Sequence, residues 1–388
     1  MHPFLPAPTP LLAIRDLAVS FAPSRTGADR RVQAVDGVQM TIYPRQVLAV
    51  VGESGCGKSV TALSLLRLLP RHSARFDRGS AVFQSRRGPR DLLSIPDDDL
   101  RSIRGGEIAM IFQEPMSSLN PVFSIGDQIV EAIRLHRPGE LGSASRAGKE
   151  AKLLAIEAMR SVGIAEPEKR LNAFPHQFSG GMRQRVMIAM ALACRPVLLL
   201  ADEPTTALDA TVQQQILGLL HDLRSNAAGL GSSGLAIMLI THDLGIVSEH
   251  ADVVCVMYAG RVVEYATARE LFTNPLHPYT RGLLACIPRV HERRERLATI
   301  AEVIEQEGAF APPPGTAPDV RPWWPHHAFP GGASPALEPA SDYVLYEPKP
   351  DHWIGAWRTE SLRTTSPRPP DLRHHEDQSV GQAAAPAA

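Results

Sequence analysis

The sequence predicts an α/β fold, and three observations support this prediction. First, the apolar runs at 197–201 and 236–240 are continuous, as expected for parallel strands covered on both faces. Second, helical periods alternate with such runs, as in residues 183–193. Third, a glycine-rich loop joins the apolar run at 47–51 directly to a helix at 60–69. Alternation of strand and helix is typical of an α/β sheet.

Further segments extend this core on both sides. Residues 126–164 carry helical periods around a patch rich in glycine and serine, which predicts a mostly helical insert near 120–178. A polar turn is expected at 23–31. The additional predicted strands are 11–14, 17–21, 34–40, 108–112, 253–258 and 261–265.

Composition excludes several classes of protein. The chain has 388 residues, of which 44 % are apolar, so a sizeable core is expected. Its 40 basic and 41 acidic residues nearly cancel, which argues against a general nucleic-acid or membrane-surface binder. The four cysteines form no C-x-x-C pair, so neither a zinc nor an iron–sulfur site is expected. The first residues lack a signal-peptide pattern, and no apolar run approaches the roughly 20 residues that cross a bilayer.

The most informative motif is G-x-x-x-x-G-K-S at residues 52–59, between a strand and a helix. Glycines let the backbone N–H groups of a tight turn converge on one anion, and the following helix directs its positive end there. Lys58 can reach the β- and γ-phosphates, and the Ser59 hydroxyl can bind Mg²⁺. The motif therefore predicts binding of a nucleoside triphosphate. The predicted contacts are Gly52, Glu53, Ser54, Gly55, Cys56, Gly57, Lys58, Ser59 and Val60.

Two carboxylates follow the apolar strand at 197–201. Asp202 at the tip of a buried strand can hold Mg²⁺, directly or through water. Glu203 can then accept a proton from the attacking water or orient it. A polar pair that merely caps a strand is the alternative interpretation, and the phosphate loop argues against it.

A third motif begins a helix. Ser179 can cap it, while Gly180 and Gly181 would let a phosphate approach the bare backbone. Taken alone, this segment is an ordinary helix cap. Its position between the phosphate loop and the carboxylate strand gives it more weight.

In their order along the chain, these motifs resemble those of the nucleotide-binding subunit of an ABC (ATP-binding cassette) transporter. The signature motif at 178–182 departs from most of the family, with Phe178 and Met182 in place of leucine and glutamine, but the serine and both glycines are intact. The resemblance implies roles for further residues: Gln113 as the Q-loop glutamine that senses Mg²⁺, Asp209 in the D-loop, His242 as the switch histidine at the γ-phosphate, and Phe21 as the aromatic that stacks on adenine.

The resemblance also implies a domain organisation. A P-loop NTPase cassette, with a mixed sheet, an antiparallel part and a helical subdomain, is expected over 10–285. The proline- and tryptophan-rich segment 286–358 would form a C-terminal extension, and 359–388 a disordered tail. Within the extension, the aromatics around 323–325 and 343–357 are expected to pack locally.

Two stretches outside the general motifs, 113–121 and 274–284, resemble the ATPases of oligopeptide, dipeptide and nickel importers. Uptake of peptides is therefore expected, with nickel or opine-type solutes as the alternative. A soluble ABC ATPase of translation or DNA repair, or a regulatory subunit that binds ATP without hydrolysis, is the more distant alternative. The ATPases of oligopeptide, dipeptide and nickel importers often carry an iron–sulfur cluster in a C-terminal extension. No cluster is expected here, because no cysteine follows Cys286.

The family's mechanism implies several partners. Ser179, Gly180 and Gly181 would serve the ATP of a second ATP-binding subunit, related but not identical. The cleft near Gln113 would grip a helix of one of two transmembrane permease subunits. An extracytoplasmic solute-binding protein would act indirectly, and no nucleic acid is expected. The implied location is peripheral, on the cytoplasmic face of the bacterial inner membrane.

Overall fold

The structure is a computed structural model of the chain. It describes residues 9–22, 31–113, 118–205, 208–225, 234–287, 299–306, 308–325, 343–359, 362 and 370–372.

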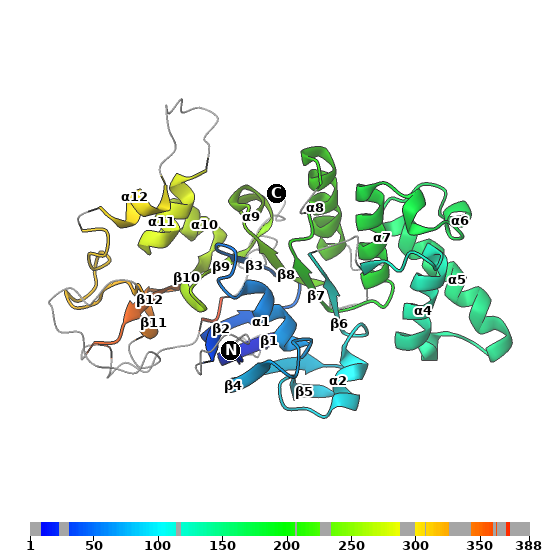
Figure 1. The fold of residues 1–388 in the computed structure, drawn as a ribbon, viewed down its shortest axis with the longest axis horizontal. Coiled ribbons are helices and arrows are strands. Elements are labelled where there is room, and N and C mark those ends of the chain that lie inside the picture. Colours follow the sequence, from blue (N-terminus) through cyan, green and yellow to red (C-terminus); the bar gives the residue numbers. More distant parts are fainter. Residues whose placement is uncertain are drawn as a thin grey trace, which may run out of the picture.

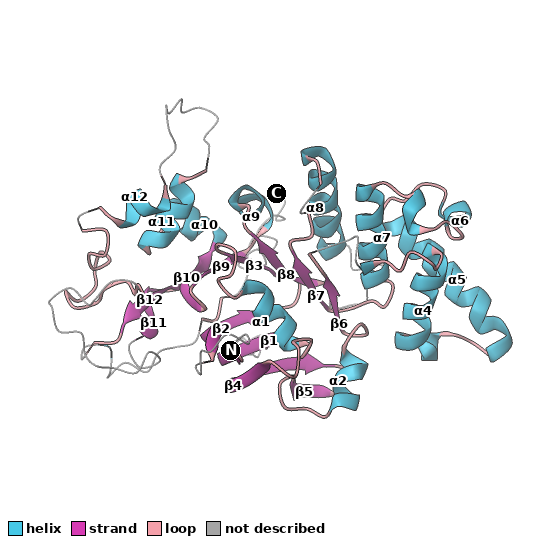
Figure 2. Cartoon of the chain, viewed as in Figure 1, coloured by secondary structure: helices cyan, strands magenta, loops and turns pink. Residues whose placement is uncertain are grey.

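A mixed sheet of eight strands forms the centre of the molecule, in the order β11-β12-β10-β9-β3-β8-β7-β6 (Figures 1 and 2). Five neighbouring strands, β6, β7, β8, β3 and β9, pair in parallel. The strands β10, β12 and β11 then continue the sheet in antiparallel pairs. The strands are β3 (Val47–Val51), β6 (Ile108–Ile111), β7 (Leu198–Asp202), β8 (Ala236–Thr241), β9 (Val253–Tyr258), β10 (Arg261–Thr267), β11 (Tyr343–Lys349) and β12 (His352–Trp357). The parallel strands β3, β7 and β8 are buried throughout, which explains their continuous apolar runs.

A second, antiparallel sheet has the order β2-β1-β4-β5. Its strands are β1 (Leu12–Phe21), β2 (Val32–Ile42), β4 (Ala74–Ser85) and β5 (Gly88–Asp91). β1 joins both predicted segments 11–14 and 17–21, because an irregularity between Ile14 and Leu17 shifts the register without ending the strand. The sequence did not predict β4 or β5. Most of β4 is at least partly exposed, so its apolar pattern is weak.

Figure 1 shows groups of helices at opposite ends of the main sheet, with α1, α8 and α9 beside its middle. α4 to α7 gather at one end, where Ile129, Met159 and Ile188 share a hydrophobic cluster. The helices are α1 (Lys58–Leu65), α2 (Asp97–Ile103), α4 (Ile125–His136), α5 (Ala144–Ser161), α6 (Pro167–Arg170), α7 (Gly180–Leu192), α8 (Ala210–Ser225), α9 (Leu244–His250), α10 (Ala268–Thr273), α11 (Pro278–Ala285) and α12 (Ile300–Ile304), with short 3-10 turns at Pro138–Glu140 and Pro175–Gln177.

The C-terminal segment is continuous with the main sheet, because β12 pairs with β10. Trp353 of β12 is fully buried, and its ring meets that of Tyr265 edge to face at 5.9 Å. The aromatics of this segment were expected to pack locally. Trp353 instead also packs against Tyr265 of β10 in the main sheet. The division into domains at 285 and 358 stays a prediction.

A buried carboxylate fastens this junction. Glu264 of β10 is fully buried and accepts hydrogen bonds from the backbone N–H groups of Leu276 (2.8 Å) and His277 (2.9 Å). His352 of β12 donates to it through Nε2 at 2.6 Å. Three donors compensate for the removal of this carboxylate from water, so loss of any one of them would leave a costly buried charge.

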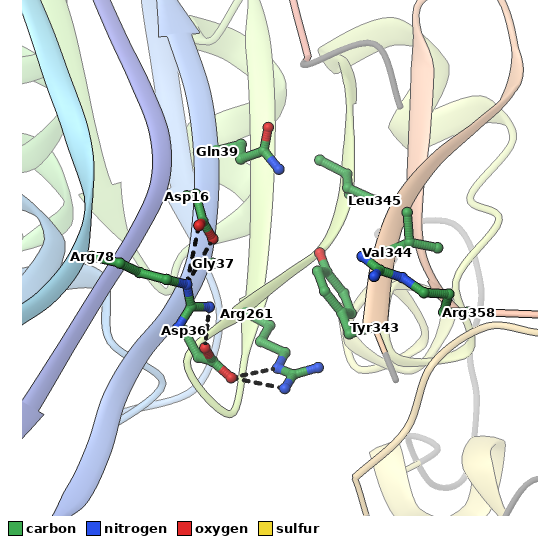
Figure 3. A pocket seen from close by; sticks show the side chains of 10 residues that line it. All are labelled: Asp16, Asp36, Gly37, Gln39, Arg78, Arg261, Tyr343, Val344, Leu345 and Arg358. Carbon is green, nitrogen blue, oxygen red and sulfur yellow. Dashed lines mark hydrogen bonds and ion pairs between the residues drawn. The ribbon is translucent and has the colours of Figure 1, made fainter. Parts of the chain in front are cut away.

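A second junction joins the antiparallel sheet to the C-terminal segment. Figure 3 shows Asp36 of β2 between the guanidinium groups of Arg78 and Arg261, each 2.7 Å away. The Arg261 guanidinium lies over the rings of Trp323 (4.7 Å) and Tyr343 (4.8 Å). A small pocket of about 90 Å³ lies at this junction (Figure 3). One aspartate thus links the two sheets with the extension.

Residues 370–372 of the predicted tail pack on the core. Gln46 donates a side-chain hydrogen bond to the carbonyl of Leu372 at 2.9 Å, and Leu372 is buried. Thr41 donates to the carbonyl of Pro370 at 3.0 Å. Most of the remaining tail lies outside the described residues.

His277 provides a test of the fold through pH. It is fully buried, its Nε2 donates to the carbonyl of Trp323 at 2.9 Å, and its Nδ1 accepts from the N–H of Tyr279 at 3.2 Å. Both bonds together require the neutral ring. Burial lowers the pKa of His277 to about 4. The unfolded chain therefore binds more protons between about pH 6.5 and pH 4, and the free energy of unfolding should fall by up to about 3 kcal/mol across that window.

Denaturant titrations from pH 7 to pH 4 measure this slope. His277→Asn should be less stable at pH 7 and should lose the part of the slope due to this residue. The exposed His72→Asn is the control and should keep the full slope. Equal slopes for wild type and His277→Asn would contradict the assignment.

Candidate active site

The phosphate loop runs from the end of β3 into α1 (Figure 1). Gly52 and Gly57 have φ angles of 149° and 103°, in a region that other residues rarely adopt. A Cβ atom on Gly52 would lie 2.2 Å from the carbonyl oxygen of Met257, and one on Gly57 would lie 2.7 Å from that of Ala34. Both backbone shape and available space therefore require glycine here.

Lys58 is folded into this loop. Its Nζ donates hydrogen bonds to the carbonyls of Gly52 (2.7 Å) and Glu53 (2.8 Å). The thiol of Cys56 lies 3.7 Å from the same Nζ, and burial raises the pKa of this thiol, so it stays neutral. The Lys58 ammonium is therefore a positive charge held against the backbone carbonyls of the phosphate loop.

Asp202 ends β7 beside the loop. Its Oδ1 accepts a hydrogen bond from the Ser59 hydroxyl at 3.0 Å. Burial raises the pKa of Asp202, and the hydrogen bond from Ser59 opposes that rise. A hydroxyl and a carboxylate at this distance are the hard oxygen donors that Mg²⁺ prefers, so the pair fits that ion. The described parts of the chain contain no cluster of three or more His, Cys, Asp or Glu residues that could hold a metal.

The next residue, Glu203, contacts both other predicted catalytic residues, Gln113 and His242. Its carboxylate accepts a hydrogen bond from Gln113 Nε2 at 3.0 Å, and its other oxygen lies 3.3 Å from His242 Nδ1. The Glu203 backbone is left-handed, with a φ of 47°, and its N–H is fixed by the carbonyl of Ile240 at 2.9 Å. Strained backbone of this kind clusters at functional sites.

The signature residues begin α7. Ser179 is its N-cap and accepts a hydrogen bond from the backbone N–H of Met182 at 3.3 Å. Met182 contributes its main chain to this cap, so the departure from glutamine leaves the turn intact. Gly180 is exposed and Gly181 is half-buried, and a Cβ on Gly181 would lie 2.6 Å from a methyl group of Val212. The signature turn is therefore capped within α7 and lies directly against α8.

Two further predicted residues, Asp209 and Phe21, have the following neighbours. Asp209 precedes α8 and accepts a hydrogen bond from the Val212 N–H at 3.0 Å. Ala207, two residues before Asp209, lies outside the described residues. Phe21 is half-buried at the end of β1, opposite Val32 and Ala74. Stacking of Phe21 on adenine stays a prediction.

A groove of about 700 Å³ joins the site to the helical end of the molecule. Ser59, Asp202 and Gln113 line it on the sheet side, and Met187 of α7 lines it on the helical side. Phe112 also lines the groove and is 43 % exposed. Gln113 and the Ser59–Asp202 pair therefore share one opening with an apolar surface.

Comparison with known proteins now decides the family. A family described as "ABC transporter" matches residues 35–206, and one described as "Oligopeptide/dipeptide transporter, C-terminal region" matches 263–311. A probable peptide ABC transporter ATP-binding protein of Sinorhizobium fredii is 45 % identical over 354 residues, covering 91 % of this chain and 96 % of that one. The chain belongs to the ABC transporter family.

Other comparisons agree with this assignment of the cassette. The dipeptide transport ATP-binding protein DppD of Bacillus subtilis is 44 % identical over 305 residues, which are 79 % of this chain and 84 % of that one. A dimeric ATP-binding cassette in a post-hydrolysis state, bound to ADP and Pi, has a TM-score of 0.54 at 24 % identity, covering 66 % of this chain and 99 % of that one. The predicted fold and family are confirmed.

One residue of the cassette's site was missed by the sequence reading. The hydroxyl of Tyr279 accepts a hydrogen bond from the N–H of Glu53 in the phosphate loop at 3.0 Å. Tyr279 lies within the stretch 274–284, which drew attention only as a mark of the subfamily. A buried aromatic with a polar tip inside such a stretch is the signal that could have found it.

Lys58→Ala should weaken ATP binding by about 100-fold, because the variant loses charge-assisted hydrogen bonds to the phosphates. Isothermal titration of the purified chain with Mg-ATP measures the dissociation constant. Lys169→Ala, which removes an exposed lysine paired with Glu166, is the matched control and should bind as wild type does. Unchanged affinity in Lys58→Ala would remove the phosphate-loop assignment.

Proposed function

We propose that this chain is the ATP-hydrolysing subunit of an ABC importer that takes up peptides or related small solutes through partner permeases. The observation that carries the proposal is the Glu203 carboxylate held between Gln113 and His242, beside a glycine-rich phosphate loop. The relatives named for peptide and dipeptide transport support the class of solute, as does the family match over 263–311.

The residues would divide the work of phosphoryl transfer to water. Backbone N–H groups of the loop and Lys58 would bind the phosphates of ATP. Ser59 and Asp202 would hold Mg²⁺ with Gln113 nearby, and the ion would neutralise charge on the phosphate oxygens. Glu203 would orient the attacking water and accept its proton. His242, with its side chain 65 % exposed, can reach both Glu203 and the γ-phosphate.

The signature residues support a two-chain site. Ser179 and Gly180 are exposed at the start of α7, Gly181 beside them is half-buried, and the Ser179 side chain bonds only the N–H of Met182 within that helix. We expect them to close on the ATP bound by a second ATP-binding subunit, related but not identical to this one. Asp209 would lie at the same interface. Closure would exclude water from the site, and hydrolysis would reopen it.

The groove at Phe112 is the expected docking place for a permease. Gln113 follows Phe112 directly, so a helix seated in the groove would lie one residue from the catalytic group. Such coupling would place the chain on the cytoplasmic face of the bacterial inner membrane, as a peripheral subunit of two permeases. No described helix is both long and apolar enough to span a bilayer. An extracytoplasmic solute-binding protein would act through those permeases.

Glu203→Gln should keep ATP affinity and lower turnover by at least about 100-fold, because the neutral amide cannot accept the proton of the attacking water. ATPase assays of the assembled transporter measure turnover, and gel filtration with ATP detects the trapped closed pair of ATP-binding subunits. Glu157→Gln, on the exposed side of α5, is the control and should hydrolyse normally. Normal turnover in Glu203→Gln would remove Glu203 from its role.

Phe112→Ser should reduce co-purification of the chain with its permeases, because the apolar contact in the groove is lost. ATP affinity of the isolated chain should stay within about twofold, since Phe112 contributes no phosphate ligand. Leu153→Ser is the control: Leu153 is 65 % exposed on α5 and does not line this groove. Equal recovery of permeases with both variants would contradict docking here.

A further inference from the structure

The C-terminal region of the chain touches the phosphate loop through one side chain. Tyr279 is the second residue of α11, and its hydroxyl accepts a hydrogen bond from the N–H of Glu53 at 3.0 Å. The tyrosine is fully buried. Glu53 is the second residue of the loop, so this bond reaches the loop close to the end of β3.

The ring of Tyr279 is held by other aromatic rings. Tyr258, at the end of β9, lies 4.6 Å away between ring centroids, and Trp324 of the extension lies 6.0 Å away. Trp324 stacks on Tyr258 at 4.3 Å with an interplanar angle of 17°. These contacts leave the hydroxyl little freedom, and burial raises its pKa so that it remains neutral.

The backbone at Tyr279 is fixed by the same extension. His277 caps α11 by accepting from the Tyr279 N–H, and its other ring nitrogen donates to the carbonyl of Trp323 at 2.9 Å. The N–H of Trp323 in turn donates to the carbonyl of Gly355 in β12 at 2.8 Å. An unbroken series of hydrogen bonds therefore runs from the extension strand to the loop.

Glu53 connects this series to Lys58, the lysine of the phosphate loop. Its N–H is bound by Tyr279, and its carbonyl accepts a hydrogen bond from Lys58 Nζ at 2.8 Å. A shift of Glu53 would therefore move both the first turn of the loop and one partner of Lys58. The Glu53 N–H would also lose its acceptor, the Tyr279 hydroxyl.

We infer that Tyr279 is a positioning residue for ATP binding, through which the C-terminal extension holds the phosphate loop in its binding shape. The inference rests on the proposed function, since ATP is the ligand of this loop. Tyr279 acts through Glu53 and has no contact with the reacting atoms in this arrangement.

Tyr279→Phe removes the hydroxyl and keeps the packed ring. We expect the dissociation constant of Mg-ATP for the full-length chain to rise about three- to tenfold, the range set by loss of one hydrogen bond. In the assembled transporter, KM for ATP should rise by a similar factor while kcat stays within about twofold.

The matched control is Tyr265→Phe. Tyr265 is also fully buried, and its hydroxyl donates to the carbonyl of Thr41 at 3.0 Å, away from the loop. Both variants should lower Tm, because both lose a buried hydrogen bond. Only Tyr279→Phe should weaken ATP binding. Equal dissociation constants for the two variants would reduce Tyr279 to a structural residue and overturn the inference.

A second variant keeps the test decisive if Tyr279→Phe does not fold. Trp324→Phe shortens the aromatic wall behind Tyr279 and leaves the hydroxyl in place. It should weaken ATP binding in the same direction, and an unchanged dissociation constant would again overturn the inference. A wild-type chain that binds no Mg-ATP would remove the proposed function itself, whereas wild-type binding with unaffected variants would remove only the role of Tyr279.

Discussion

The candidate site depends on the parallel register of four strands. Ile111 pairs with Ala201, Asp202 with Ile240, and Val51 with Thr241. The four strands therefore end level at one edge of the sheet, and the residues that follow them meet there: Gly52, Gln113, Glu203 and His242. A slip of one residue in any pair would turn every side chain of that strand to the other face and separate these groups.

Much of this arrangement could be predicted from the sequence, because its signals are local. A continuous apolar run marks each central strand, and the phosphate loop is a fixed pattern of glycines within one turn. The strands β4 and β5 and the helix α2 were missed because most residues of each are at least partly exposed, which weakens their apolar patterns. β11 and β12 were missed as sheet strands because they join the main sheet only through the pairing of β12 with β10, which links residues about 90 positions apart, as with Glu264 and Ile354. Tyr279 belongs to the same class, since its partner Glu53 is distant in sequence.

The site combines a rigid part with an accessible part. Lys58 and Asp202 are buried and fixed by the loop and by Ser59. His242 and Gln113 are exposed and reach the strained Glu203 from neighbouring strands. The residues expected to bind phosphate are therefore held in place by the phosphate loop, whose backbone conformation is fixed by the packing around it. The groups assigned to the reacting water lie where a partner subunit or a docked helix can change their positions.

The pairing of β12 with β10 has a consequence for shortened forms of the chain. In the described structure, β10 lies between β9 and β12, so its backbone donors and acceptors on the second side are satisfied by His352, Trp353 and Ile354. A chain cut before residue 343 would lack β11 and β12 and would leave the apolar β10 as an unpaired edge strand. Such edges recruit strands from other molecules. Truncation there would favour self-association of the truncated protein into insoluble aggregates.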